Sequence, residues 1–354
     1  MEITFLVGNG FDLSLGYKTS YKDFYEYYLN QTRDSKDKAI SCLRDSIAND
    51  LNSGSSLWTD FEVGLGKFTQ EFGEDQADNF IDAYLDASQK LHDYLFNLPK
   101  LSGPEELTEE QLDTARKNIY HFYQAGTQQE QIDFSNLIGN DKANGNEISF
   151  KFVSFNYTNF LDEYIASLAQ KPIETWDFRS EIKKCVIKPK VFHVHGLLND
   201  YPILGLSSED QILNPAFQNN EDIRAALIKT NIESSIGYRS CSTLKGLINK
   251  SRIVCLWGLS LGDSDKHWWN FIVNWLHEDP NRIIVIFKHG VPPPSNILPF
   301  DRRRKTMNVT SLLLKHSELL KHSAISDMEK IFLIQRIHVI FTPETLFEFP
   351  LKDK

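Results

Sequence analysis

The segment EITFLVGNGFD, which spans residues 2–12, decides the fold. Its short apolar run ends in Gly8-Asn9-Gly10, a pattern typical of a buried parallel strand followed by a tight turn. The sequence SYKD at residues 20–23 then predicts a helix N-terminus with a capping box, and the helix continues to about Tyr28. The chain therefore begins with a strand, a glycine turn and a helix, the unit from which α/β proteins are built.

Apolar runs of strand length return after residue 146 and alternate with helical patterns. The expected strands lie at residues 149–155, 190–194, 252–257, 282–287 and 335–341, the last of them an edge strand. The helical patterns lie at residues 157–168, 216–228 and 264–276. Strands that alternate with helices predict an α/β fold with a mainly parallel, Rossmann-like sheet flanked by helices.

The stretch between these two regions has a different composition. Residues 34–146 are rich in Asp, Glu, Gln, Asn and Lys, and their apolar residues have helical spacing. One amphipathic helix is expected over residues 80–95 and another over residues 108–123. We therefore expect an α-helical insertion at 34–146, after the first βα unit, and a core composed of residues 1–33 and 147–354.

Composition and charge limit the classes of function. The chain has 354 residues, of which 41% are hydrophobic and 24% charged, as in a globular protein rather than a disordered or collagen-like one. Its formal net charge of -10 disfavours a nucleic-acid partner, because such binding needs a basic surface. The four cysteines form no C-x-x-C pair, so no structural metal is expected. The chain shows neither a signal peptide nor an apolar run of transmembrane length, which predicts a cytoplasmic protein without membrane contact.

Residues at the ends of the expected strands are informative, because ligands of open α/β sheets bind beyond the carboxyl ends of the strands. After the first strand, the glycines of Gly8-Asn9-Gly10-Phe11-Asp12 allow a sharp turn and a close approach to a phosphate. This loop is neither a complete G-x-G-x-x-G nor a P-loop, and a plain tight turn is the alternative. After residues 149–155, the Asn156 amide can orient a ribose hydroxyl or a water, although Asn156 and Thr158 also suit a helix N-cap.

Two further strand ends carry polar residues. His193 and His195 alternate on an expected strand, and His195, next to Gly196, is the better placed as a general base, because histidine titrates near neutral pH. A satisfied structural histidine is the alternative. The segment GLSLGDSD, residues 258–265, has glycines and serines that can cradle a phosphate or a ribose, while its acidic residues also suit a helix N-terminus.

In this order, the motifs resemble the AbiH-like abortive-infection proteins of bacterial phage defence. The residues that carry the resemblance are Gly8 to Asp12, Thr19 to Phe24, Trp58, Glu62, Phe155 to Thr158, His193 to Gly196, Gly258 to Leu261 and Asp265. The resemblance implies an effector that stops the growth of the infected cell and responds to a phage-derived trigger. The helical insertion then serves to recognise that trigger or to form a homo-oligomer, or it simply packs onto the sheet.

The same layout is similar to the sirtuin-like NAD-binding fold. That similarity implies that Gly8 and Gly10 face the pyrophosphate of NAD and that Asn156 contacts the nicotinamide ribose. It also makes His195 the base and places Ser260 along the nucleotide. The residues that complete the expected NAD site are Asn9, Phe11, Asp12, Thr158, Gly196, Gly258, Leu261 and Asp265. The chain departs from sirtuin deacetylases because it has no four-cysteine zinc module and has Thr158 where an acid is usual.

The sequence therefore supports three hypotheses. The first is an NAD-consuming defence effector that hydrolyses the nicotinamide–ribose bond, in which Asn156 orients the reactants and His195 accepts a proton. The second is a metal-dependent nuclease or phosphohydrolase toxin whose Mg²⁺ ligands are Asp12, Glu62, Asp263 and Asp265. The third is a sensor that binds a nucleotide without turnover and signals through the helical insertion. We favour the first, with NAD as the substrate.

Overall fold

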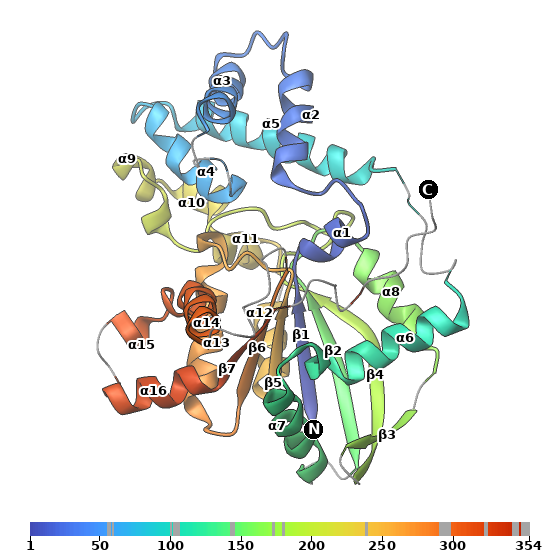
Figure 1. Ribbon diagram of the computed structural model, residues 1–354. Helices are drawn as coiled ribbons and strands as arrows, with labels where there is room; N and C mark the ends of the chain where they lie inside the picture. Colours follow the sequence, from blue (N-terminus) through green and yellow to red (C-terminus); the bar gives the residue numbers. More distant parts are fainter. Residues whose placement is uncertain are drawn as a thin grey trace.

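The sheet at the centre of the protein has seven strands in the described part of the chain and is parallel except at one edge (Figure 1). The computed structural model describes residues 1–54, 58, 60–99, 101, 107–141, 146–171, 174–178, 181–237, 240–289, 299–321, 325–341 and 347. The strand order is β3-β4-β2-β1-β5-β6-β7. The strands are β1 (Glu2–Val7), β2 (Glu147–Ser154), β3 (Glu174–Phe178), β4 (Glu181–His193), β5 (Ile253–Trp257), β6 (Ile283–Lys288) and β7 (Ile337–Phe341).

Most of the strands expected from the sequence are confirmed. The strands β1, β2, β5, β6 and β7 begin and end within two residues of the expected bounds, and β7 is an edge strand. The expected strand at 190–194 is only the end of β4, which begins at Glu181. The strand β3 was not expected, and it pairs antiparallel with the first half of β4.

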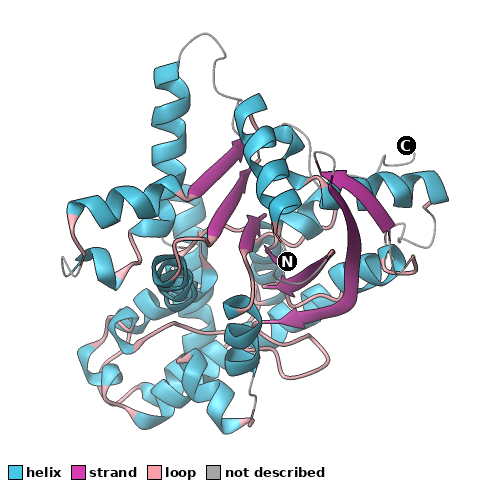
Figure 2. Ribbon diagram, turned by 90° about the horizontal axis from the view of Figure 1, so that it is seen from below, coloured by secondary structure: helices cyan, strands magenta, loops and turns pink. Residues whose placement is uncertain are grey.

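Helices cover both faces of the sheet, because alternate strand residues point to opposite sides (Figure 2). In β1, Phe5 packs into one core and Leu6 into the other. The helices on the Phe5 side are α6 (Glu109–Tyr120), α7 (Gln128–Asn140) and α8 (Phe160–Leu168). Those on the Leu6 side are α12 (Ser240–Asn249), α13 (Lys266–Glu278), α14 (Pro299–Leu314) and α16 (Asp327–Gln335). The chain is therefore a mixed α/β protein with a mostly parallel, three-layered core.

A third apolar core lies beyond the carboxyl ends of the strands (Figure 1). We call the helices that form it the helical cap: α2 (Tyr21–Gln31), α3 (Lys38–Ser53), α4 (Phe61–Phe68), α5 (Ala77–Phe96), α9 (Pro215–Gln218) and α10 (Glu221–Leu227). Its buried centre is aromatic, with Phe24, Phe61 and Phe80 among its members. The cap faces the edge of the sheet where ligands of α/β proteins bind.

The packing divides residues 34–146 between two places. Helices α3, α4 and α5 belong to the helical cap, whereas α6 and α7 pack onto the sheet through side chains such as Ile119 and Phe134. The cap also takes in α2 from before this stretch and α9 and α10 from after residue 200. The stretch expected as a helical insertion is thus helical and contributes to two different cores.

Helix ends follow the local signals in the sequence. The Ser20 hydroxyl accepts the N–H of Asp23 at 3.2 Å at the start of α2, and Thr108 opens α6 with a complete capping box. The region 216–228, expected as one helix, is divided into α9 and α10, because Asn220 caps a new helix there. The remaining helices are α1 (Gly10–Ser14), α11 (Lys229–Ser235) and α15 (Glu318–Lys321), with short 3₁₀ turns at Thr69–Glu71, Phe122–Ala125, Glu209–Gln211 and Asp263–Asp265. No described helix combines the length and apolarity needed to cross a membrane.

Candidate functional site

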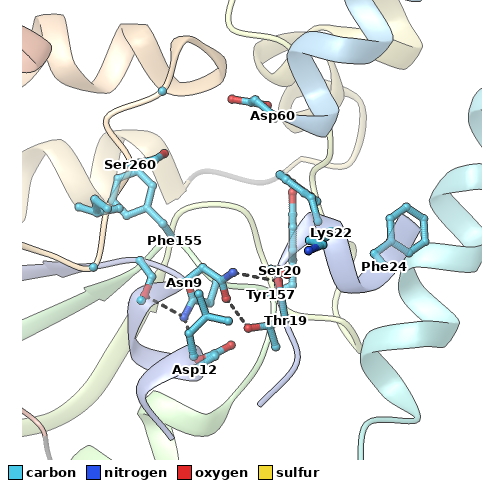
Figure 3. A pocket seen from close by; sticks show the side chains of 18 of the residues that line it. Asn9, Asp12, Thr19, Ser20, Lys22, Phe24, Asp60, Phe155, Tyr157 and Ser260 are labelled. Carbon is cyan, nitrogen blue, oxygen red and sulfur yellow. Dashed lines mark hydrogen bonds between the residues drawn. The ribbon is translucent and has the colours of Figure 1, made fainter. Parts of the chain in front are cut away.

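A cavity of ≈ 1190 Å³ lies between the carboxyl edge of the sheet and the helical cap (Figure 3). Most residues expected in the NAD site line it: Gly8, Asn9, Gly10, Asp12, Asn156, Thr158, His195, Gly258, Ser260 and Asp265. Phe11, Gly196 and Leu261 are not part of its lining. The cap adds side chains from the opposite wall, including Phe24, Asp60 and Glu62. The four strand-end motifs therefore meet around one cavity.

The cavity lies where the strand order reverses. From β1 the chain continues to β2 on one side, and from the adjacent β5 it continues to β6 on the other side. The loops that follow β1 and β5 diverge at such a point and leave a crevice, which is the usual ligand site of open α/β sheets. Here they also touch, because Gly8 N–H donates to Trp257 O at 2.9 Å and Gly10 N–H to Gly258 O at 3.0 Å.

The glycines of the first motif serve this contact between loops. A Cβ on Gly10 would lie 2.5 Å from Gly258 Cα, and one on Gly8 would lie 2.7 Å from Gly258 O. Gly258 itself has a φ of 65°, which favours glycine. The N–H groups of Gly8, Gly10 and Phe11 all donate to protein carbonyls. The structure shows that these glycines bring two chain segments together, and the phosphate contact expected from the sequence stays a prediction.

The three motif residues outside the lining have structural roles. Phe11 is fully buried, with its ring centroid 5.4 Å from Tyr164 and 6.3 Å from Trp257. Gly196 has a φ of 70° and turns the chain sharply after His195. Leu261 places its side chain in the core beneath α13. All three support the positions of neighbours that do face the cavity.

Asn9 joins the first loop to the start of the helical cap. Its Nδ2 donates to Thr19 O at 2.8 Å, and its Oδ1 accepts the Thr19 hydroxyl at 2.6 Å (Figure 3). Both ends of the amide are therefore used within the protein. The side chain fixes the segment that leads into α2, and Ser20 at the N-cap and Lys22 in the first turn of that helix both line the cavity.

Asp12 is the buried carboxylate at the base of the cavity. Its Oδ1 accepts from Asn156 Nδ2 at 2.9 Å, and its Oδ2 accepts the Thr158 hydroxyl at 2.6 Å. Burial raises the pKa of Asp12 to about 7, although these two hydrogen bonds favour the ionised form. A carboxylate that follows β1 is therefore held against Thr158, which follows β2.

The two histidines of the third motif have different partners. His193 Nδ1 lies 3.2 Å from Asn156 O, and its Nε2 lies 2.9 Å from Asp162 Oδ2, so this ring holds the Asn156 loop in place. His195 is buried against the cavity, with Nε2 3.1 Å from Asp265 Oδ1. Burial lowers the pKa of His195, and the nearby Lys229 lowers it further. Both effects favour the neutral imidazole, the form that can accept a proton, whereas Asp265 acts in the opposite direction.

Lys229 is a functional candidate that the sequence did not reveal. Its ammonium is buried and lies 2.8 Å from Asp265 Oδ1 and 3.1 Å from Glu62 Oε2. Although burial opposes it, Lys229 together with His195 holds the pKa of Asp265 well below its ordinary value. Burial raises the pKa of Glu62 to about 7, against the opposite effect of Lys229. No motif or strand end marks Lys229, because its burial depends on contacts with residues far away in sequence.

The four carboxylates considered as Mg²⁺ ligands do not converge. Asp12 is bonded to Asn156 and Thr158, while Glu62 and Asp265 share Lys229. Asp263 is half-exposed and pairs with Lys315 at 3.1 Å. Within the described ranges, no group of three or more His, Cys, Asp or Glu residues is placed to hold a metal ion.

Fold and site together define a mostly parallel α/β protein with a cavity of ligand size at the carboxyl edge of its sheet. Residues 4–287 match the family described as bacteriophage abortive infection AbiH, and the chain belongs to this family. The resemblance found in the sequence is thereby confirmed, and the family indicates a role in phage defence by abortive infection. No curated protein matches the chain.

Proposed function

We propose that the cavity binds NAD and that the protein hydrolyses the nicotinamide–ribose bond. One observation carries this proposal: residues from four separate strand ends line a single cavity at the point where the strand order reverses. Without the edge strand β3, the order β4-β2-β1-β5-β6-β7 equals the 3-2-1-4-5-6 order of doubly wound dinucleotide-binding sheets. The cavity exceeds the roughly 300–1,000 Å³ of ordinary small-molecule pockets, so it has room for a dinucleotide.

The charged lining offers partners for the pyrophosphate. Since Gly8 and Gly10 use their N–H groups within the protein, cationic side chains have to meet the phosphate charge. Lys22 at the start of α2 and Lys288 at the end of β6 both line the cavity. They would hold the pyrophosphate between the helical cap and the sheet, and leave Asn156 and His195 for the nicotinamide ribose.

The chemistry needs little covalent participation by the protein. The bond between ribose C1′ and the nicotinamide nitrogen breaks, its electron pair stays with the leaving nitrogen, and neutral nicotinamide departs. Water adds to C1′, which has oxocarbenium character in the transition state, and its proton passes to His195. Asn156, held by Asp12, orients the ribose or the water, which lowers the entropic part of the barrier. The products are nicotinamide, ADP-ribose and a proton.

The test is release of nicotinamide and ADP-ribose from NAD by purified protein, with and without a lysate of phage-infected cells. His195→Ala and Asn156→Ala are each expected to lower turnover at least about 100-fold. His277→Ala at the end of α13 and Asn249→Ala at the end of α12 are matched controls, because neither residue lines the cavity. Binding of NAD by calorimetry without turnover in either condition would leave a nucleotide sensor. Absence of both binding and turnover, with constant NAD in infected cells, would refute the proposal.

A further inference from the structure

Lys229 is the buried cation between the helical cap and the cavity. It begins α11, and its side chain is 1% exposed. Its ammonium has three acceptors: Asp265 Oδ1 at 2.8 Å, Glu62 Oε2 at 3.1 Å and Ser264 O at 3.2 Å. Three acceptors match the three donors of an ammonium group, so the side chain is fixed in one place.

Asp265 connects this cation to the proposed base. The same oxygen that receives Lys229, Oδ1, lies 3.1 Å from His195 Nε2. At this distance the carboxylate charge acts on the imidazole, although Nε2 has no hydrogen-bond partner among the described residues. On the opposite side, Glu62 belongs to α4 of the helical cap and also accepts Gly205 N–H at 2.9 Å.

We propose that Lys229 is the positioning residue of the site: its ammonium holds the Asp265 carboxylate beside His195 and connects this carboxylate to helix α4 through Glu62. The catalytic consequence of this role rests on the proposed function. The arrangement of charges is independent of the proposed function, because contacts within the protein alone define it. A lysine is needed rather than a neutral donor, because two buried carboxylates without a counter-charge would be strongly disfavoured.

The charged groups around His195 determine whether each of them raises or lowers its pKa. Lys229 is the nearby cation and opposes a second positive charge on His195, whereas Asp265 favours it. His193 on β4 adds a small effect in the same direction as Lys229. Asp60 at the N-cap of α4 and Glu62 within α4 add negative charge to this group of residues. His267 on α13 also faces it, and burial lowers the pKa of His267 to about 3. His267 is therefore neutral in the range where His195 titrates.

The experiment is an NMR titration of the His195 imidazole in NAD-free full-length protein, with its resonance assigned from His195→Ala. Lys229→Met should raise the pKa of His195 by roughly one unit or more, since the repelling charge is gone. Asp265→Asn should lower it, because the attracting charge is gone. Lys229→Arg should keep it near the wild-type value, and Lys250→Met, an exposed residue after α12, should not change it.

The outcomes separate this role from a merely structural one. If Lys229→Met is too unstable to titrate, Lys229→Met combined with Glu62→Gln removes one of the two unpaired carboxylates and carries the same expectation. An unchanged His195 pKa on loss of the ammonium, or shifts of the same sign in Lys229→Met and Asp265→Asn, would overturn the proposal. Where NAD is hydrolysed, the acidic limb of the pH profile of kcat/KM should move with the His195 pKa. Absence of NAD binding and turnover, with constant NAD in infected cells, would refute the proposed function and leave the titration result standing.

Discussion

Asp12 and Thr158 are 146 residues apart in the sequence, and a hydrogen bond of 2.6 Å joins them at the base of the cavity. The bond connects helix α1, which follows β1, with the loop after β2, because these two strands are neighbours in the parallel sheet. Asn156 Nδ2 donates to the other carboxylate oxygen of Asp12 at 2.9 Å. The Asp12 carboxyl group therefore fixes the side chains of both Asn156 and Thr158, so its protonation state matters for the site.

Asp12→Asn should remove a pH-dependent part of the stability. Because the folded-state pKa of Asp12, about 7, lies above the ordinary 3.8, the folded protein binds this proton more tightly than the unfolded chain. The resulting stabilisation is complete below about pH 4 and is lost as the pH rises through 7. At about 1.4 kcal/mol per pKa unit, the wild type should lose on the order of 3–4 kcal/mol relative to Asp12→Asn over this range. Urea unfolding at pH 4.5, 6 and 8 measures it.

A second variant separates this effect from the general response of the protein to pH. Asp133→Asn changes an exposed aspartate on α7 and should leave the pH dependence of the wild type unchanged. If the unfolding free energies of wild type and Asp12→Asn stay parallel from pH 4.5 to 8, Asp12 does not have a raised pKa in the folded protein.

Gly10→Ala should disrupt the junction of the two loops. The added Cβ would lie 2.5 Å from Gly258 Cα, a backbone atom that no side-chain rotation can remove. We expect a loss of about 2 kcal/mol or more in unfolding free energy, as for overpacked cores. Gly246→Ala is the matched control in the exposed interior of α12, where no atom lies within 4 Å of the new Cβ. It should stabilise the protein by roughly 0.5–1 kcal/mol through helix propensity.

The parallel strands could be predicted because their sequences carry the signal themselves. The run of β5 is apolar throughout, and those of β1 and β6 depart from this only at Glu2, Thr4 and Lys288, as expected for strands buried on both faces. The strand β3 was missed because it lies at the sheet edge and alternates exposed and half-buried residues such as Asp177. The first half of β4 is similarly rich in lysine, and only its pairing with β2 and β3 makes it a strand.

The site residues that directly follow a strand could be predicted from the sequence. Asn156 and His195 both line the cavity, as expected from their positions after β2 and β4. The role of Gly10 could not be foreseen, because it depends on how the loops after β1 and β5 touch. Lys229 was missed for a similar reason: its partner Glu62 is 167 residues away, and burial of a lysine leaves no local pattern.

Two adjacent tryptophans of α13 should respond differently to the same substitution. Trp269 Nε1 donates to Gly262 O at 2.8 Å, and its ring stacks on Phe155 of the cavity wall with centroids 5.4 Å apart. Trp268 is equally buried, but its Nε1 has no hydrogen-bond partner among the described residues. Trp269→Phe should therefore cost about 1–2 kcal/mol more unfolding free energy than Trp268→Phe, because it removes the hydrogen bond to the partly buried Gly262 carbonyl. Equal losses in chemical denaturation would show that the bond to Gly262 contributes nothing.

Glu62 and Lys229 should be strongly coupled in stability. Lys229→Met leaves Glu62 and Asp265 buried without their cation, and we expect a loss of about 3–5 kcal/mol. Glu62→Gln alone removes one carboxylate and leaves Lys229 paired with Asp265, so its cost should be smaller. In the double variant, only Asp265 lacks its cation. The cost of Lys229→Met should therefore be at least about 1 kcal/mol smaller in the Glu62→Gln background, measured as a double-mutant cycle at pH 8, where Glu62 is ionised in the wild type.

The pH dependence of the cycle provides its own control. Because burial raises the pKa of Glu62 to about 7, this carboxyl is protonated in the wild type at pH 5.5 and carries no charge for Lys229 to balance. The coupling energy between the two positions should therefore fall markedly from pH 8 to pH 5.5. A cycle with Lys266 and Asp210, an exposed pair with contacts of 2.6 and 2.8 Å, should give a small coupling at both pH values. Coupling between Glu62 and Lys229 that is equally large at pH 5.5 would mean that Glu62 stays ionised there, so that Lys229 overcomes the effect of burial.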